Sequence, residues 1–84
     1  MSAPAATAFA MSPDDVMIGM HATATIDCDI IISGQLTLIL DSGEYVLRPG
    51  DVVIMRGDRH AWRNDGDVPA LMAAATISTE PGAA

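Results

Sequence analysis

Two histidines are the side chains best suited to chemistry in this chain of 84 residues. The first opens a run in which every second residue is polar, at positions His21, Thr23, Thr25, Asp27 and Asp29. Because the side chains of a β-strand alternate between its two faces, these five share one face if the run is a strand. His60 and Trp62 share a face of a later run in the same way. Imidazole titrates near neutral pH and ligates metals, so acid–base catalysis and metal binding are the chemistries to consider.

The residues alone leave a plainer interpretation open. An antiparallel strand with one solvated face shows the same alternation of polar and apolar side chains. On this interpretation the polar face of residues 21–29 points to water, and His60 is a packed or surface residue. The spacing therefore predicts polar strand faces without deciding between a pocket and solvent.

The elements that would position these side chains are short strands separated by turns. Turn-forming Gly, Pro, Asn, Asp and Ser residues recur at positions 34, 41–43, 49–50, 57–58 and 64–67. Most of the runs between them are rich in β-branched or large apolar residues, and we predict strands at 23–33, 35–40, 44–48, 51–55, 59–63 and 70–78. Six short strands joined by tight turns favour an all-β barrel or sandwich, since closure protects the strand edges.

The two ends of the chain lack this pattern. Residues 1–18 are rich in Ala and contain Pro4 and Pro13, so we expect a flexible arm that lies across a sheet edge or adds one or two strands. Residues 79–84 are expected to form a disordered tail. The predicted organisation is one barrel domain over residues 19–78 between the arm and the tail.

Charge and composition exclude several function classes. The net charge is −7 with four arginines and no lysine, so we expect neither a nucleic-acid partner nor an anionic membrane surface, and lysine Schiff-base chemistry is excluded. Cys28 is the only cysteine, so it cannot form an intrachain disulfide. In a strand its side chain points to the face opposite that of Asp27, and we predict a small core hydrophobe that faces away from the polar face. No apolar run is long enough to span a bilayer, and the opening residues lack the regions of a signal peptide, so we expect a cytoplasmic protein.

Two segments resemble the conserved motifs of the cupin superfamily. The first has its glycines, histidine and carboxylate in the cupin order, at Gly19, His21, Asp27 and Gly34. The second joins a Pro-Gly-Asp turn at 49–51 to Gly57, His60 and Asn64. The resemblance implies a small jelly-roll barrel of about six to eight antiparallel strands, with the site inside it.

The resemblance also implies a site, and this chain departs from the family pattern within it. The surviving catalytic or metal-ligating residues are His21, Asp27 and His60, while Thr23, Thr25 and Trp62 line the substrate pocket. Thr23 replaces the second His of the family's His-x-His pair, and Asp27 replaces its Glu. The set that remains suits a divalent metal (Fe, Zn, Mn or Ni), with two His and one carboxylate typical of non-haem iron(II). A metal-free site in which the histidines act as acid and base is the alternative.

The function that follows is a small-molecule enzyme with a degenerate metal site. We expect a proton-transfer reaction, that is, a dehydratase, isomerase or epimerase. The alternatives are a non-catalytic module that binds a small ligand and a non-haem iron oxygenase. A homodimer is also expected, because one small barrel leaves apolar runs such as residues 30–32 uncovered.

Overall fold

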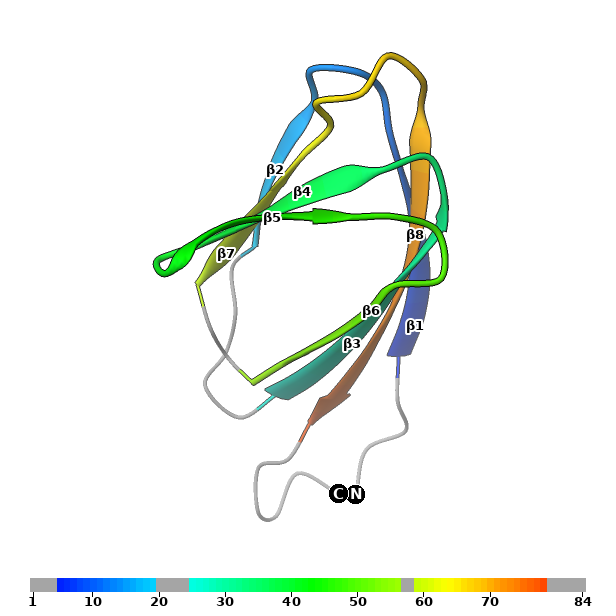
Figure 1. Ribbon diagram of the computed structural model, residues 1–84. Helices are drawn as coiled ribbons and strands as arrows, with labels where there is room; N and C mark the ends of the chain where they lie inside the picture. The colour runs from blue at the N-terminus through cyan, green and yellow to red at the C-terminus, as the bar shows by residue number, and fades with distance from the viewer. Residues whose placement is uncertain (1–4, 20–24, 57–58, 79–84) are drawn as a thin grey trace.

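Eight antiparallel strands form two four-stranded sheets in a computed structural model that describes residues 5–19, 25–56 and 59–78 (Figure 1). The first sheet has the order β1 (Ala5–Met11), β8 (Ala70–Ser78), β3 (Thr25–Ser33) and β6 (Val52–Met55). The second has the order β2 (Val16–Gly19), β7 (His60–Arg63), β4 (Leu36–Leu40) and β5 (Gly43–Leu47). The all-β prediction is confirmed, and the six predicted strands agree with the observed bounds within two residues. No helix of the described residues is long and apolar enough to cross a membrane.

The segment before residue 19 adds two strands to the barrel, which is one of the alternatives that we expected for it. It forms β1 beside β8 and β2 beside β7, both antiparallel (Figure 1). The physical reason is burial of apolar side chains: Met11 belongs to the core, and Phe9 and Met17 pack against it. Pro13 and Asp14 lie in the turn between the two strands, where Asp14 has a φ of 70°. The predicted tail at 79–84 lies outside the described residues.

The hydrophobic core lies between the two sheets. Its largest fully buried side chain is Trp62, and its buried members are Met11, Ile31, Leu36, Leu38, Met55, Trp62, Ala70 and Met72. Along β3 the inward face changes from Ile31 to Asp29 and Asp27. Opposite these two carboxylates β8 places only the small residues Ala74 and Thr76. One end of the interior is therefore filled by large apolar side chains, while the other end is left hollow.

Asn64 is a buried polar residue whose side chain links the end of β1 to the loop that precedes β8. Its side chain is 0% exposed, and Nδ2 donates hydrogen bonds to the carbonyl oxygens of Met11 at 2.9 Å and Val68 at 3.0 Å. Its Oδ1 accepts a hydrogen bond from the backbone N–H of Gly66 at 2.9 Å. The Asn that ends the second motif thus ties the end of β1 to the loop between β7 and β8, which is a structural role.

Candidate functional site

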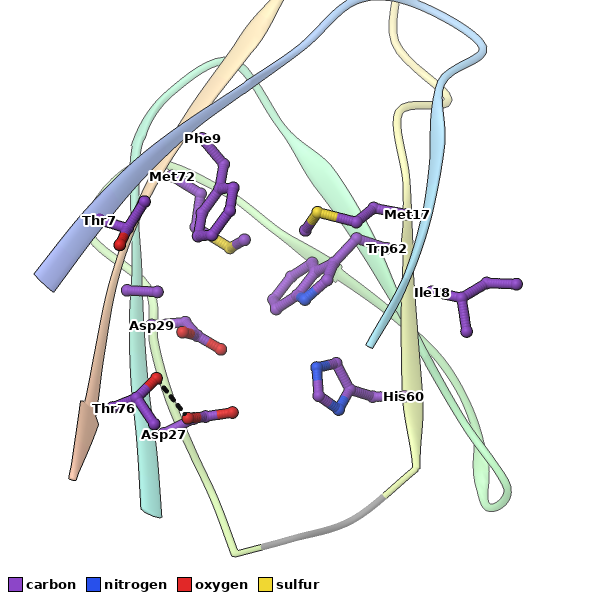
Figure 2. A pocket seen from close by; sticks show the side chains of 11 residues that line it. Thr7, Phe9, Met17, Ile18, Asp27, Asp29, His60, Trp62, Met72 and Thr76 are labelled. Carbon is purple, nitrogen blue, oxygen red and sulfur yellow. Dashed lines mark hydrogen bonds between the residues drawn. The ribbon is translucent and has the colours of Figure 1, made fainter. Parts of the chain in front are cut away.

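A cavity of about 190 Å³ lies between the sheets (Figure 2). Strands β1, β2, β3, β7 and β8 supply its described lining, which is Thr7, Phe9, Met17, Ile18, Asp27, Asp29, His60, Trp62, Met72, Ala74 and Thr76. Figure 2 shows the aromatic rings and the methionines at one end and the carboxylates with the imidazole at the other. An engineered apolar cavity of about 150 Å³ is large enough for benzene, so this cavity has room for a ring-sized molecule.

Asp27 is held at the polar end by a neighbouring strand. It lies on β3 in register with Thr76 of β8, whose Oγ1 donates a hydrogen bond to Asp27 Oδ1 at 2.8 Å (Figure 2). This contact fixes the carboxylate toward the cavity and satisfies one of its oxygens. Its other oxygen can accept a hydrogen bond from a bound molecule.

Asp29 is the most deeply buried acidic group of the site. Asp29 lies two residues from Asp27 on the same face of β3, and only 5% of the surface of Asp29 is exposed. Among the described residues no hydrogen bond to its carboxylate is present. The pKa of Asp29 is raised from 3.8 to about 6, mainly by burial and further by the charge of Asp27, while His60 acts in the opposite direction. The group therefore titrates close to neutral pH.

His60 faces the two carboxylates from the other sheet. It is the first residue of β7, in register with Gly19 of β2, and its half-buried imidazole points into the cavity (Figure 2). Trp62, two residues further on and 1% exposed, lies on the same face as the spacing predicted. The structure thus brings Asp27, His60 and Trp62 to one cavity.

The comparisons with known proteins establish the family of this chain. The family model described as a cupin domain matches residues 8–77. The chain belongs to the cupin domain family. The match begins inside β1, so the cupin domain includes a strand of the segment that the sequence analysis had assigned to the arm.

Solved cupin structures share the jelly-roll fold. The Cupin_2 domain of an XRE family transcriptional regulator from Enterobacter cloacae superposes with a TM-score of 0.85 at 23% identity, covering 92% of this chain and 83% of that chain. A sugar phosphate isomerase of the cupin superfamily from Silicibacter pomeroyi has a TM-score of 0.81 at 24% identity, covering 94% of this chain and 53% of that chain. At this identity the likeness shows the fold alone, and the predicted cupin jelly roll is confirmed.

Sequence relatives come from fungi. The cupin-domain-containing oxidoreductase virC of Hypocrea virens is 37% identical over 71 residues, which are 80% of this chain and 37% of that protein. Phomopsin biosynthesis cluster protein C' of Diaporthe leptostromiformis is 48% identical over 46 residues, which are 54% of this chain and 24% of that protein. The cupin therefore aligns with only 24% to 37% of the length of these two relatives.

Of the three metal ligands predicted for this cupin, the structure describes Asp27 and His60. Among the residues described, no group of three or more His, Cys, Asp or Glu side chains is arranged to hold a metal ion. His21 and Thr23 lie outside the described residues, as does the side chain of Thr25. The residues described do not by themselves fit a metal. The roles predicted for the motif residues stay predictions.

Two residues differ from the sequence analysis. Asp29 was placed on the polar face but not in the site, although its spacing of two from Asp27 already put both carboxylates on the same side. Cys28 faces away from the cavity as predicted, but it is exposed and not a core residue. The reason is that none of the described residues covers the outer face of β3, where Cys28 lies.

Proposed function

We propose that this cupin binds a small organic molecule in the cavity and transforms it by proton transfer, in a dehydration, isomerisation or epimerisation. The observation that carries the proposal is the position of His60 across an apolar cavity from Asp27 and Asp29. Imidazole accepts and donates protons near neutral pH, which is what such reactions require.

Each part of the cavity has a role in this proposal. The apolar end, with Phe9 and Trp62, holds the body of the molecule and keeps water from it. His60 takes a proton from a carbon next to a carbonyl group of the substrate, and the electron pair of the C–H bond moves into that carbonyl group. In an isomerisation or epimerisation the imidazolium returns the proton at another position or on the other side, and in a dehydration it protonates the hydroxyl group, which leaves as water. The two carboxylates offset the positive charge that the imidazole gains when it holds the proton.

The burial of Asp29 supports a functional role. A carboxylate that is buried without hydrogen bonds from the described residues lowers the stability of the fold. Such groups are uncommon in folded proteins and concentrate at functional sites. A purely structural position on β3 would be served better by an apolar side chain.

A second candidate, an oxidoreductase, is favoured by the names of relatives such as virC. That chemistry needs a redox-active group, and the cupin resemblance implies a divalent metal held by His21, Asp27 and His60. When bound, the metal would supply the electron transfer or oxygen activation. Metal dependence therefore separates the two candidates.

Hydrogen exchange tests the proposal without knowledge of the natural substrate. Acetophenone is a neutral, ring-sized ketone, and the loss of its methyl signal in D₂O is followed by ¹H NMR. We expect the protein to accelerate the exchange at pH 7.5, with His60→Ala lowering the acceleration by 10²-fold or more, the range found for general acid–base groups. The exposed Asp41→Asn serves as the control and retains the full rate.

Chelation decides between the candidates in the same assay. Exchange that survives removal of metal but is lost in His60→Ala supports proton transfer by the imidazole. Exchange that is lost on chelation and restored by a divalent metal would assign the proton transfer to a metal-assisted site, which would contain the metal that the oxidoreductase candidate requires. A protein that binds acetophenone without any exchange would contradict the enzymatic proposal and leave a ligand-binding module.

A further inference from the structure

The polar end of the cavity is acidic. Of the described side chains that line it, two are carboxylic and only His60 is basic. Arg63 lies on the opposite face of β7, where its guanidinium binds Glu44 at 2.7 Å and Asp65 at 2.6 Å. Among the described residues the cavity therefore contains no Arg and no Lys with which to bind a carboxylate or a phosphate.

The apolar end fits a flat or branched hydrocarbon group. Phe9, Met17, Trp62 and Met72 surround it (Figure 2). Aromatic rings pack well against other rings, and methionine adapts to irregular shapes. A ligand with one ring fills this end and places a short substituent among the carboxylates.

We propose that the cavity selects a neutral or cationic ligand with a ring-sized apolar body and a hydrogen-bond-donating group, such as an arylalkyl amine or alcohol, and that Asp29 is the residue that sets this selectivity. The inference rests on the proposed function in one respect, namely that the cavity is the ligand site. Asp27 and Asp29 accept hydrogen bonds from an amine or hydroxyl group, whereas an anionic group meets like charge at a poorly solvated position.

Trp62 is the only tryptophan of the chain and lines the cavity, so its fluorescence reports binding there. The probes are 2-phenylethylamine, 2-phenylethanol and phenylacetate, which share a body and differ in the polar group. With the protein as purified at pH 7.5, we expect saturable changes with the amine and the alcohol. Phenylacetate should bind at least tenfold more weakly than the amine.

Two matched variants separate Asp29 from the overall negative charge. Asp29→Asn should lower the affinity for the amine about tenfold and change the affinity for the alcohol less than twofold. The difference in affinity between the amine and phenylacetate should therefore become smaller. Asp41→Asn removes one charge from an exposed turn and should leave all three affinities unchanged.

Phenylacetate binding as tightly as the amine would overturn the selectivity while the cavity remains the ligand site. An equal loss of amine affinity in both variants would also overturn it, because it would assign the effect to net charge. The absence of a fluorescence change with every probe would contradict both the selectivity and the proposed function.

A second inference comes from the outer face of the first sheet. Its side chains alternate with those that face the cavity, and every one that is described is apolar. Ala73 and Ala75 of β8 pair with Ile30 and Cys28 of β3, and β1 lies on the far side of β8. Val52 and Ile54 of β6 form the other edge of the sheet. Monomeric proteins rarely expose a contiguous apolar patch larger than a few hundred Å².

We infer that a second copy of this chain covers this face, in a two-fold symmetric dimer of stacked sheets. The chain carries a net charge of −7, so two copies repel each other over most of their surfaces. The described side chains of this face carry no charge, and two copies stacked on it bring no carboxylates together. A symmetric interface also needs a surface that complements itself, and an apolar sheet face does so.

The oligomeric state tests this inference with a matched pair of valines. Val52 on the apolar face and Val68 in the loop before β8 are both 54% exposed. In light scattering at 50 μM, we expect twice the chain mass of 8.7 kDa for the unmodified protein and for Val68→Glu. Val52→Glu combined with Ile54→Glu should give the mass of the single chain, with a circular dichroism spectrum that shows a folded protein.

A monomer at this concentration would contradict the inference and assign the face to another protein or to a further segment of a longer chain. A dimer that survives the double substitution would also contradict it, since the interface would then lie elsewhere. If the double variant does not fold, Val52→Glu alone replaces it in the test. This single substitution should weaken the affinity of the dimer at least tenfold relative to Val68→Glu.

Discussion

Replacing Asp29 by Asn should stabilise the protein at neutral pH. The residue is 5% exposed, and burial is the main cause that raises its pKa from 3.8 to about 6. Each pH unit between the pKa values of the folded and unfolded chain corresponds to 1.36 kcal/mol, so the ionised carboxylate lowers the free energy of unfolding by about 3 kcal/mol. Asn has nearly the same shape and carries no charge.

The sign of the pH dependence follows from the raised pKa. Because the folded chain holds this proton more tightly than the unfolded chain, the contribution of Asp29 to stability is greatest below about pH 4 and is lost as the pH rises through about 6. The charged groups that face it, Asp27 on its own strand and His60 on β7, are present in both proteins. The advantage of Asp29→Asn should therefore be about 3 kcal/mol at pH 7.5 and close to zero at pH 4.

Urea unfolding between pH 4 and pH 8, followed by circular dichroism, measures this difference. We expect Asp29→Asn to unfold at a higher urea concentration at pH 7.5 with an unchanged slope, which reports stability and not compactness. The exposed Asp41→Asn should follow the unmodified protein at every pH. Equal stability of Asp29→Asn and the unmodified protein at pH 7.5 would refute the account of Asp29, and so would an advantage that persists at pH 4.

Three further substitutions test the fold around the site. Asn64→Ala removes the three hydrogen bonds of a fully buried residue and should cost about 3 kcal/mol in urea unfolding, whereas a loss below about 1 kcal/mol would contradict the structural role given to this residue. Gly34→Ala should lower the free energy of unfolding by roughly 3 kcal/mol, because Gly34 has a φ of +72° and a Cβ would lie 2.7 Å from the carbonyl oxygen of Pro69. An unchanged melting temperature would disprove this close approach. Arg63→Ala breaks only exposed ion pairs, so its melting temperature should match that of the unmodified protein, and a large loss would show that these pairs carry more of the stability than exposed pairs usually do.

The strands that could be predicted are those whose signals are local. The turn at residues 41–43 and the apolar residues on either side of it are enough to place β4 and β5 within one residue. The bounds of β1 could not be predicted, because alanine has no preference for strands and the partner of β1 is β8, at the other end of the chain. Its strand conformation depends on a pairing between Ala5 and Thr76, which no local pattern contains.

The same limit applies to the site. Alternation along single strands placed Asp27 and His60 on polar faces, and the cupin resemblance placed them inside the fold. The burial of Asp29 was not predictable in this way, because it depends on how two sheets, built from strands distant in the sequence, enclose the interior. The exposure of Cys28 was missed because nothing in the local sequence shows that the outer face of its sheet is uncovered.

A crystal structure of the protein grown with acetophenone tests the central claim, that the cavity is the site where His60 acts on a small molecule. We expect electron density that places the ring against Phe9 and Trp62 and the ketone group at the polar end of the cavity. The methyl carbon should then lie within about 3.5 Å of an imidazole nitrogen of His60, the separation of a near-attack geometry. Clear density for acetophenone only outside the cavity, or with the methyl group directed away from His60, would contradict the account.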